Sequence, residues 1–184
     1  MATLISGSTG VNKITDGTIV DADVANIAAS KLTGTVASAR MPTGSVLQVV
    51  NDHHDSMVTT SSQTYTDTGL EAAITPSSAS NNILILVTLP VRKHNTSSND
   101  TSAHVKIIRG STTVKEFGRY MAWNNTVNNY AQETVSFCYT DTAADTTSAT
   151  TYKVQIKTNI NGNSTVSSCH DSSMASLTLM EIAG

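Results

Sequence analysis

Aromatic and charged residues are scarce in this sequence, making up only 4% and 14% of its 184 residues. Aromatic side chains usually supply much of the buried area of a core, and an average globular chain has about 25% charged residues. Ser, Thr and Asn are abundant instead, and these residue types are common in strands and turns. The composition therefore predicts a β-rich fold whose surface is covered by hydroxyl and amide groups.

The chain also lacks a strong excess of either charge. Eleven Lys and Arg residues stand against fourteen Asp and Glu residues, for a formal net charge of −3. The basic residues form no cluster, whereas proteins that bind nucleic acid usually carry a basic patch, so nucleic acid is not an expected partner. Glycine-rich phosphate loops, zinc motifs and paired-carboxylate motifs are missing as well, and the sequence predicts neither an enzyme nor a cofactor.

Long apolar runs are missing too. None approaches the roughly 20 residues that span a bilayer, and the first residues lack the basic flank and apolar stretch of a secretion signal. We therefore expect synthesis in a cytoplasm and no membrane insertion. The two cysteines, Cys138 and Cys169, have no metal-binding spacing and are expected to be reduced thiols, because disulfides are rare in proteins that are not exported.

Residues 10–43 supply apolar side chains at intervals of three to five residues. These intervals fit neither strand alternation nor a sustained helical face, and the only helix expected is a short capped turn at residues 21–30. Residues 17–23 are echoed by residues 34–40, which suggests small β-arcs and turns. We predict that the segment winds with identical copies into a homotrimer. The oligomerisation residues would be Ile14, Ile19, Val24, Ile27, Leu32, Val36 and Met41.

Residues 44–184 contain short strand-like stretches separated by turns. The apolar run at residues 83–87 ends before Pro90 and predicts a strand covered on both faces. Residues 104–109 and 112–117 would form a hairpin. Alternation is clearest at residues 150–158, where Tyr152, Val154 and Ile156 would share one face. Further strands are expected at residues 46–50, 63–75, 119–123, 132–140 and 176–182.

This pattern predicts an all-β fold, an antiparallel β-sandwich of jelly-roll type. The expected organisation is an extended attachment and trimerisation segment at residues 1–43, followed by a sandwich domain at residues 44–184. Trp123, the only tryptophan, is expected in the core because this residue type is highly buried on average. The alternative is that Trp123, like Tyr130, stacks against a sugar ring beside Asn124 and Asn125.

Two short stretches contain residue types that can carry chemistry. Residues 53–55 (His-His-Asp) could ligate a metal, but adjacent strand residues point to opposite faces, and a polar loop is the preferred interpretation. Residues 169–171 (Cys-His-Asp) resemble part of a nucleophilic site without a glycine-rich elbow or a second histidine to act as base. We therefore assign no catalytic, cofactor-binding or metal-binding residues.

Two groups of residues resemble structural proteins of tailed bacteriophages, especially marine and cyanobacterial phages. The first, DGTIVDAD at residues 16–23 with ASKLTGTV at residues 29–36, is similar to segments of tail-fibre proteins. The second follows the expected sandwich. It consists of GSVLQVV at residues 44–50, ITPSS at 74–78, IIRGST at 107–112, TSATTYKV at 147–154 and LTLMEI at 177–182.

The resemblance implies a homotrimeric virion protein, made in the host cytoplasm, that attaches to other phage tail or capsid proteins through its N-terminal segment. Similarity of that segment to tail fibres favours a short tail fibre or receptor-binding protein. Its brevity favours the alternative, a capsid decoration protein of the cement or head-fibre kind.

If a host-cell glycan is the receptor, polar loops far from the attachment segment are the expected contacts. The candidate loops are residues 94–102, 124–129 and 159–173, the last of which departs from the phage pattern. The candidate receptor-facing residues are His94, Asn95, Asn99, Asn124, Asn125, Tyr130, Asn161 and Asp171.

Overall fold

The computed structural model describes residues 34, 36–96, 101–142, 144–160, 162 and 164–184. The chain divides into two units, Met1–Val36 and Ala37–Gly184. The helical turn expected at residues 21–30 lies outside the described residues. So do five predicted oligomerisation residues, Ile14, Ile19, Val24, Ile27 and Leu32. Within the described residues, no helix is long and apolar enough to cross a membrane.

Strands dominate the second unit, and the described residues contain no α-helix. In chain order the elements are η3 (Ser38–Arg40), β1 (Val46–His54), β2 (Val58–Thr60), β3 (Thr66–Ile74), β4 (Asn82–Asn95), β5 (Thr101–Arg109), β6 (Thr112–Asn124), β7 (Asn129–Asp141), β8 (Thr150–Thr158), β9 (Ser164–Ser168), η4 (His170–Ser172) and β10 (Ala175–Ile182).

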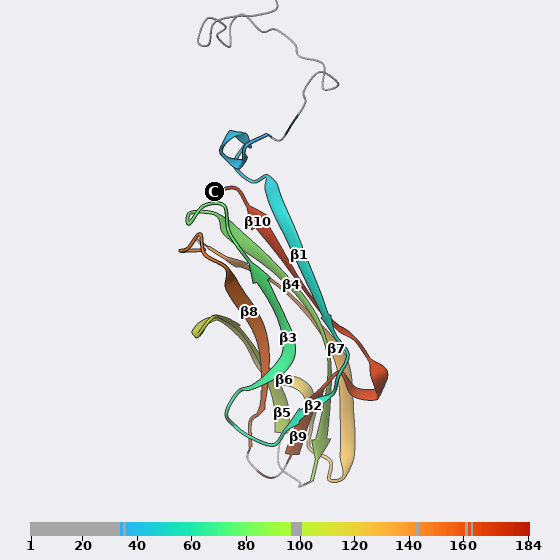
Figure 1. Ribbon diagram of the computed structural model, residues 1–184. Coiled ribbons are helices and arrows are strands. Elements are labelled where there is room, and N and C mark those ends of the chain that lie inside the picture. Colours follow the sequence, from blue (N-terminus) through green and yellow to red (C-terminus); the bar gives the residue numbers. More distant parts are fainter. Residues whose placement is uncertain (1–33, 35, 97–100, 143, 161, 163) are drawn as a thin grey trace, which may run out of the picture. The chain divides into compact units, whose positions relative to one another are not determined.

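Two antiparallel sheets pack face to face (Figure 1). One sheet has the order β1-β10-β4-β9-β2, with β7 also paired to β4, and the other has the order β3-β8-β5-β6. Without the short β2 and β9, the sheets are β1-β10-β4-β7 and β3-β8-β5-β6, which is the strand order of an eight-stranded jelly roll. The predicted antiparallel sandwich of jelly-roll type is confirmed.

Alternation along the strands places the core between the sheets. Tyr152, Val154 and Ile156 of β8 are fully buried, as predicted. In β4, Ile83 and its alternate neighbours point inward, whereas Leu84 and Leu86 are only half-buried. The prediction that residues 83–87 are covered on both faces was therefore wrong, because one face of β4 is part of the outer surface of its sheet.

Strand β4 continues eight residues beyond its last predicted position, straight through Pro90. On one side it pairs with β10 over residues 82–88 and with β9 over residues 91–95. Pro90 lies between these two pairings, and its carbonyl accepts a hydrogen bond from the Cys169 N–H at 3.1 Å. An antiparallel residue directs its N–H and C=O to the same side. The N–H that proline lacks would thus point into the gap between β9 and β10.

Several predicted boundaries also change. His53 and His54 lie in β1, paired with Ser176 and Ala175 of β10, and not in a loop. Residues 119–123 continue β6 after irregularities in its pairing with β5. The predicted loop at residues 159–173 contains β9 and η4. The hairpin between β5 and β6 is confirmed by the pairing of Arg109 with Thr112.

Candidate functional site

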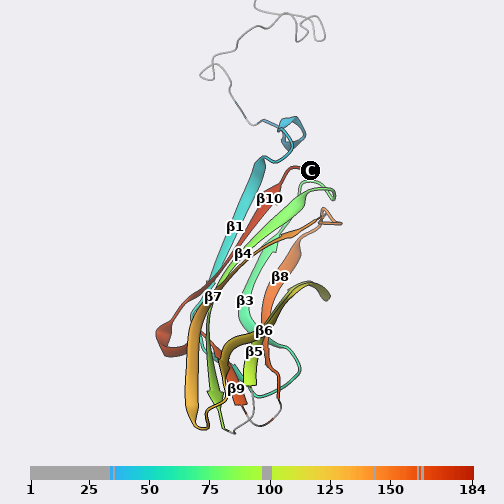
Figure 2. The ribbon, with the colours of Figure 1, turned by 180° about the vertical axis from the view of Figure 1, so that it is seen from behind.

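One end of the sandwich, named here the loop end, is where β4, β6 and β8 finish and where β5, β7 and β9 begin (Figures 1 and 2). The chain between β1 and β3, which contains β2, also passes this end. Asn95 at the end of β4 pairs with Asn129 and Ser164, and the Asn128 N–H donates to the Asn95 carbonyl at 2.8 Å. The ends of the predicted loops at residues 94–102 and 124–129 therefore meet here, and the predicted loop at residues 159–173 begins here.

The chain enters β1 and leaves β10 at the opposite end. There Val46 pairs with Ile182, Ile182 pairs with Asn82, and the Gly44 N–H donates to the Ala183 carbonyl at 2.9 Å. The loop end thus lies opposite the end at which the chain enters and leaves the sandwich.

Near the loop end, the outer surface of the first sheet carries a group of polar and aromatic side chains that we call the outer-face cluster. It consists of Met57, Arg92, His94, Tyr130 and Asp171. Three of these, His94, Tyr130 and Asp171, were predicted from sequence as receptor-facing. The structure brings them together and adds Met57 and Arg92, which the prediction missed.

Strand pairing produces the aromatic part of the cluster. His94 of β4 lies directly across from Tyr130 of β7, and their rings stack with centroids 4.4 Å apart and planes inclined by 20°. Arg92 is two residues earlier on β4 and so shares the same face. Its guanidinium carbon lies 5.4 Å from the centre of the Tyr130 ring, within the range of a cation–π contact.

The Arg92 guanidinium also contacts two exposed groups. Nη1 lies 3.4 Å from the Asp171 carboxylate, and Nη2 lies 3.6 Å from the Met57 sulfur. The Asp171 side chain is 69% exposed, whereas that of Arg92 is 23% exposed. An ion pair this open to water contributes little to stability, so the carboxylate holds Arg92 only loosely.

Asp171 is presented by an unusual backbone. Cys169, Asp171 and Ser172 have φ values of 52°, 53° and 62°, in the left-handed region that non-glycine residues seldom adopt. The Ser173 hydroxyl donates to the His170 carbonyl at 2.5 Å and closes the turn. These residues carry the chain from β9 to β10, and the turn directs Asp171 toward Arg92.

The other predicted receptor-facing residues are placed differently. Asn95 is fully buried, because β4 extends to this position and its alternation turns the side chain inward. Asn125 is exposed in the turn between β6 and β7, and Asn124 ends β6. Asn99 and Asn161 lie outside the described residues. Trp123 is 46% exposed, so its predicted core position was wrong.

Potential metal ligands and the two cysteine thiols can be placed in the part of the chain that is described. No group of three or more His, Cys, Asp or Glu residues there could hold a metal ion. Cys138 is exposed, whereas Cys169 is buried with its thiol donating to the His54 carbonyl at 3.2 Å. Burial raises the pKa of the Cys169 thiol, which disfavours the reactive thiolate.

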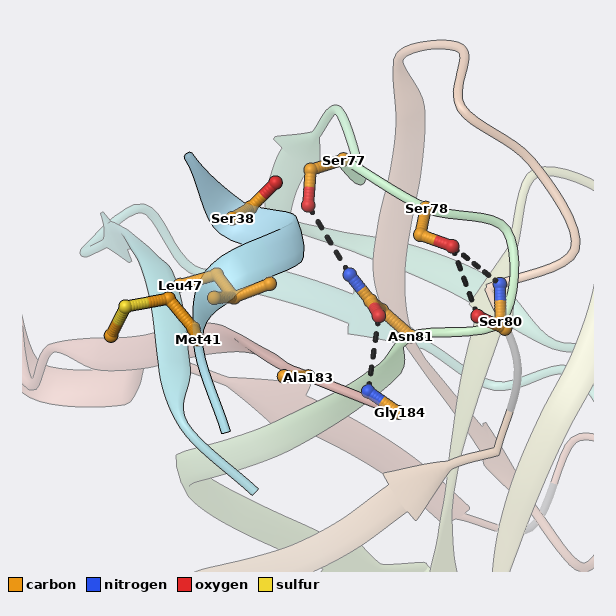
Figure 3. Close-up of a pocket in the computed structure, with 9 residues that line it drawn as sticks. All are labelled: Ser38, Met41, Leu47, Ser77, Ser78, Ser80, Asn81, Ala183 and Gly184. Carbon is orange, nitrogen blue, oxygen red and sulfur yellow. Dashed lines mark hydrogen bonds between the residues drawn. The ribbon is translucent and has the colours of Figure 1, made fainter. Parts of the chain in front are cut away.

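A pocket of about 220 Å³ lies at the end of the sandwich opposite the loop end (Figure 3). Its lining includes Ser77 and Asn81 from the β3–β4 connection, Met41 before β1, and Gly184 after β10. The Asn81 amide donates to the Ser77 hydroxyl at 3.2 Å and accepts from the Gly184 N–H at 3.1 Å. These internal bonds connect the β3–β4 connection to the end of the chain.

Comparisons with known proteins give little. No protein-family model matches the chain, and no curated protein matches it. A solved structure of the infectious bursal disease virus VP2 subviral particle is 13% identical with a TM-score of 0.32, covering 83% of this chain and 42% of that chain. A structure of T=1 particles derived from the same virus is 14% identical, also with a TM-score of 0.32, and covers 83% and 41%. The chain thus spans less than half of either viral protein, and TM-scores this low establish no shared role.

Proposed function

We propose that the chain is a non-enzymatic structural protein of a tailed-bacteriophage virion, a short homotrimeric tail fibre or receptor-binding protein for host attachment. The observation that carries this proposal is the separation of the two ends of the sandwich. The chain enters and leaves at one end, while four connections and the nearby outer-face cluster lie at or close to the other. Attachment at one end would leave the loop end free to meet a host surface, and loops on a rigid scaffold commonly carry binding.

The proposed trimer forms through the N-terminal segment, which also docks on other virion proteins. Support comes from its apolar series and from the described residues that follow it. Val36 in the first unit and Met41, Val46 and Val49 in the second are exposed in the single chain. A partner chain could cover such large apolar side chains.

Binding of labelled protein to cells of the phage's host tests the proposal. The full chain should bind to these cells and should block adsorption of the phage. The protein should also be made in the host cytoplasm and then be found in the phage particle. Replacing residues 124–129 by a Gly-Ser turn should reduce binding strongly. A matched control replaces the β5–β6 turn at residues 110–111, which lies outside the loop end. Equal loss in both variants, or no binding by the unaltered protein, would contradict host attachment through the loop end.

A capsid decoration protein, either cement or head fibre, is the second candidate. One observation favours it. Val49 on β1 is exposed, and it lies in register with the half-buried Met180 and Leu84 on the outer face of the same sheet. Such a face could lie against a shell. Electron microscopy of intact particles with a labelled antibody distinguishes the candidates: label on the tail supports the first, and label on the head supports the second.

A further inference from the structure

We propose that the outer-face cluster binds a carboxylate-bearing sugar of a host-surface glycan, with the sugar carboxylate replacing Asp171 on Arg92. This inference rests on the proposed host-attachment function and deepens it. It names a ligand chemistry, an acidic pyranose, and assigns Asp171 the role of a competing group.

The guanidinium of Arg92 is positioned for a carboxylate, and few of its N–H donors have a described partner. Arginine has five N–H donors in a planar fork that matches carboxylate geometry. Its described polar contacts are one to Asp171 at 3.4 Å and one to the Met57 sulfur at 3.6 Å. The first is long compared with a charge-assisted bond of about 2.7–2.9 Å, and the second is to a weak acceptor. A second carboxylate could therefore bind more closely than Asp171 does.

Asp171 shows where such a carboxylate would sit. It approaches the guanidinium from solvent and is 69% exposed, so it can leave without uncovering a buried surface. Its own further contact is with His170, whose Nδ1 lies 3.4 Å away. Arg92, by contrast, is only 23% exposed and also lies over the Tyr130 ring. The cation therefore remains in place when its partner is exchanged.

The surroundings favour a sugar over an acidic peptide. The Tyr130 ring stacks on His94, lies beside the cation and is 54% exposed, so its exposed part can contact the C–H groups of a pyranose. Exposed amide and hydroxyl side chains continue from it on the same face, at Gln132 and Thr134 of β7. These groups can donate to and accept from sugar hydroxyls. Three copies in the proposed trimer would add avidity to weak single sites.

The probes are tetragalacturonate, its neutral counterpart tetragalactose, and tetraglutamate, each titrated into the full chain by calorimetry. Tetragalacturonate should bind and the other two should not. Arg92→Gln should weaken binding by about tenfold or more, as expected for loss of hydrogen bonds to a charged group. Asp171→Asn should tighten it by about threefold, because the competing carboxylate is gone while the fold keeps an exposed isostere.

Lys115→Gln provides a matched control, since Lys115 also lies over a tyrosine ring, 5.5 Å from the centre of Tyr139. It should leave binding unchanged. Melting temperatures of all variants show whether each is folded. If Arg92→Gln does not fold, Asp171→Asn still decides the test.

Different failures have different meanings. Equal binding of tetragalactose, tighter binding of tetraglutamate, or no effect of Asp171→Asn would overturn the acidic-sugar inference. If tetragalacturonate fails to bind while the labelled protein still adsorbs to host cells, this inference fails and the proposed function stands. If the labelled protein does not adsorb either, the proposed function fails with it.

Discussion

Glu181 of β10 is fully buried, and its charged carboxylate is stabilised by hydrogen-bond donors. Its Oε1 accepts from the Ser77 N–H at 2.6 Å, the Ser77 hydroxyl at 2.8 Å and the Asn81 amide at 2.6 Å, while Oε2 accepts from the Gln48 amide at 2.6 Å. Burial by itself would raise the pKa of Glu181, but the donors from Asn81, Gln48 and Ser77 outweigh it and the pKa is lowered. The carboxylate thus joins the β3–β4 connection to β1 and β10.

Glu181→Gln should destabilise the sandwich by about 1–3 kcal/mol, because an amide N–H₂ would face groups that are themselves donors. The measurement is urea denaturation at pH 7, with the exposed Glu116→Gln as control. Because the folded pKa of Glu181 is lowered, its contribution is present above the unfolded pKa of about 4.3 and is lost as the pH falls through the folded value. The Glu181→Gln variant should therefore not show the loss of unfolding free energy that protonation of Glu181 causes at acid pH. An unchanged denaturation midpoint at pH 7 would contradict this role.

Gly69 of β3 has φ = +85°, and a Cβ at this position would lie 2.6 Å from Nε2 of His54 on the facing sheet. Gly69→Ala should therefore cost about 1–3 kcal/mol through backbone strain and steric overlap. Gly118→Ala is the control, since a Cβ there meets nothing within 4 Å and φ is not positive. Similar melting temperatures for the two variants would show that β3 shifts freely away from His54.

At the scale of elements, a small polar network ties the two sheets together. The Tyr152 hydroxyl of β8 donates to Asp141 of β7 at 2.8 Å, and Arg109 of β5 lies 3.0 Å from the same carboxylate oxygen. Burial and the bond to Asp141 raise the pKa of Tyr152. Burial and the charge of Glu116 raise the pKa of Tyr65 to about 12.

These two tyrosines predict a loss of stability at alkaline pH. Both remain protonated in the folded chain after the unfolded chain has begun to ionise near pH 10. The unfolded state therefore binds fewer protons, and stability falls as the pH rises from about 10 through the folded values. Urea denaturation between pH 9 and 12 measures the fall, and Tyr65→Phe with Tyr152→Phe should flatten it. An equally steep fall in the double variant would assign it to other groups.

How far the sequence predicts each element depends on its pattern. Strand β8 has the predicted bounds, because strict alternation marks both of its ends. The predicted strand at residues 83–87 ends before Pro90, whereas β4 continues to Asn95. The sequence does not show that the paired strand changes from β10 to β9 at Pro90. Strands β2 and β9 are three and five residues long, too short for a period to show.

The outer-face cluster was found only in part for the same reason. His94, Tyr130 and Asp171 belong to stretches whose composition is typical of binding loops. Arg92 shares their surface through the pairing of β4 with β7, and the register of strands so far apart in sequence cannot be derived from composition. A signal did exist: continuing the alternation of β4 beyond Pro90 places residues 92 and 94 on one face.

At the scale of the whole molecule, the proposed trimer depends on the N-terminal segment. Light scattering of the full chain at micromolar concentration should give three times the chain mass of 19.3 kDa. A variant that begins at residue 37 retains the second unit and should be a monomer with an unchanged strand content by circular dichroism. A full chain with the mass of one copy would refute the trimer. A truncated chain with the mass of three copies would show that the trimer interface lies in the sandwich.

The position of β10 between β1 and β4 affects how the protein is made. Its residues 175–182 follow every other described strand in the chain, yet they form the second strand of the first sheet. While the ribosome is still translating them, β1 has no partner there and residues 82–88 of β4 have an edge of unpaired backbone N–H and C=O groups. Such edges promote aggregation. Pairing across more than 120 residues also makes folding slow. Premature stops shortly before β10 should therefore give insoluble protein, although they remove only a small part of the chain.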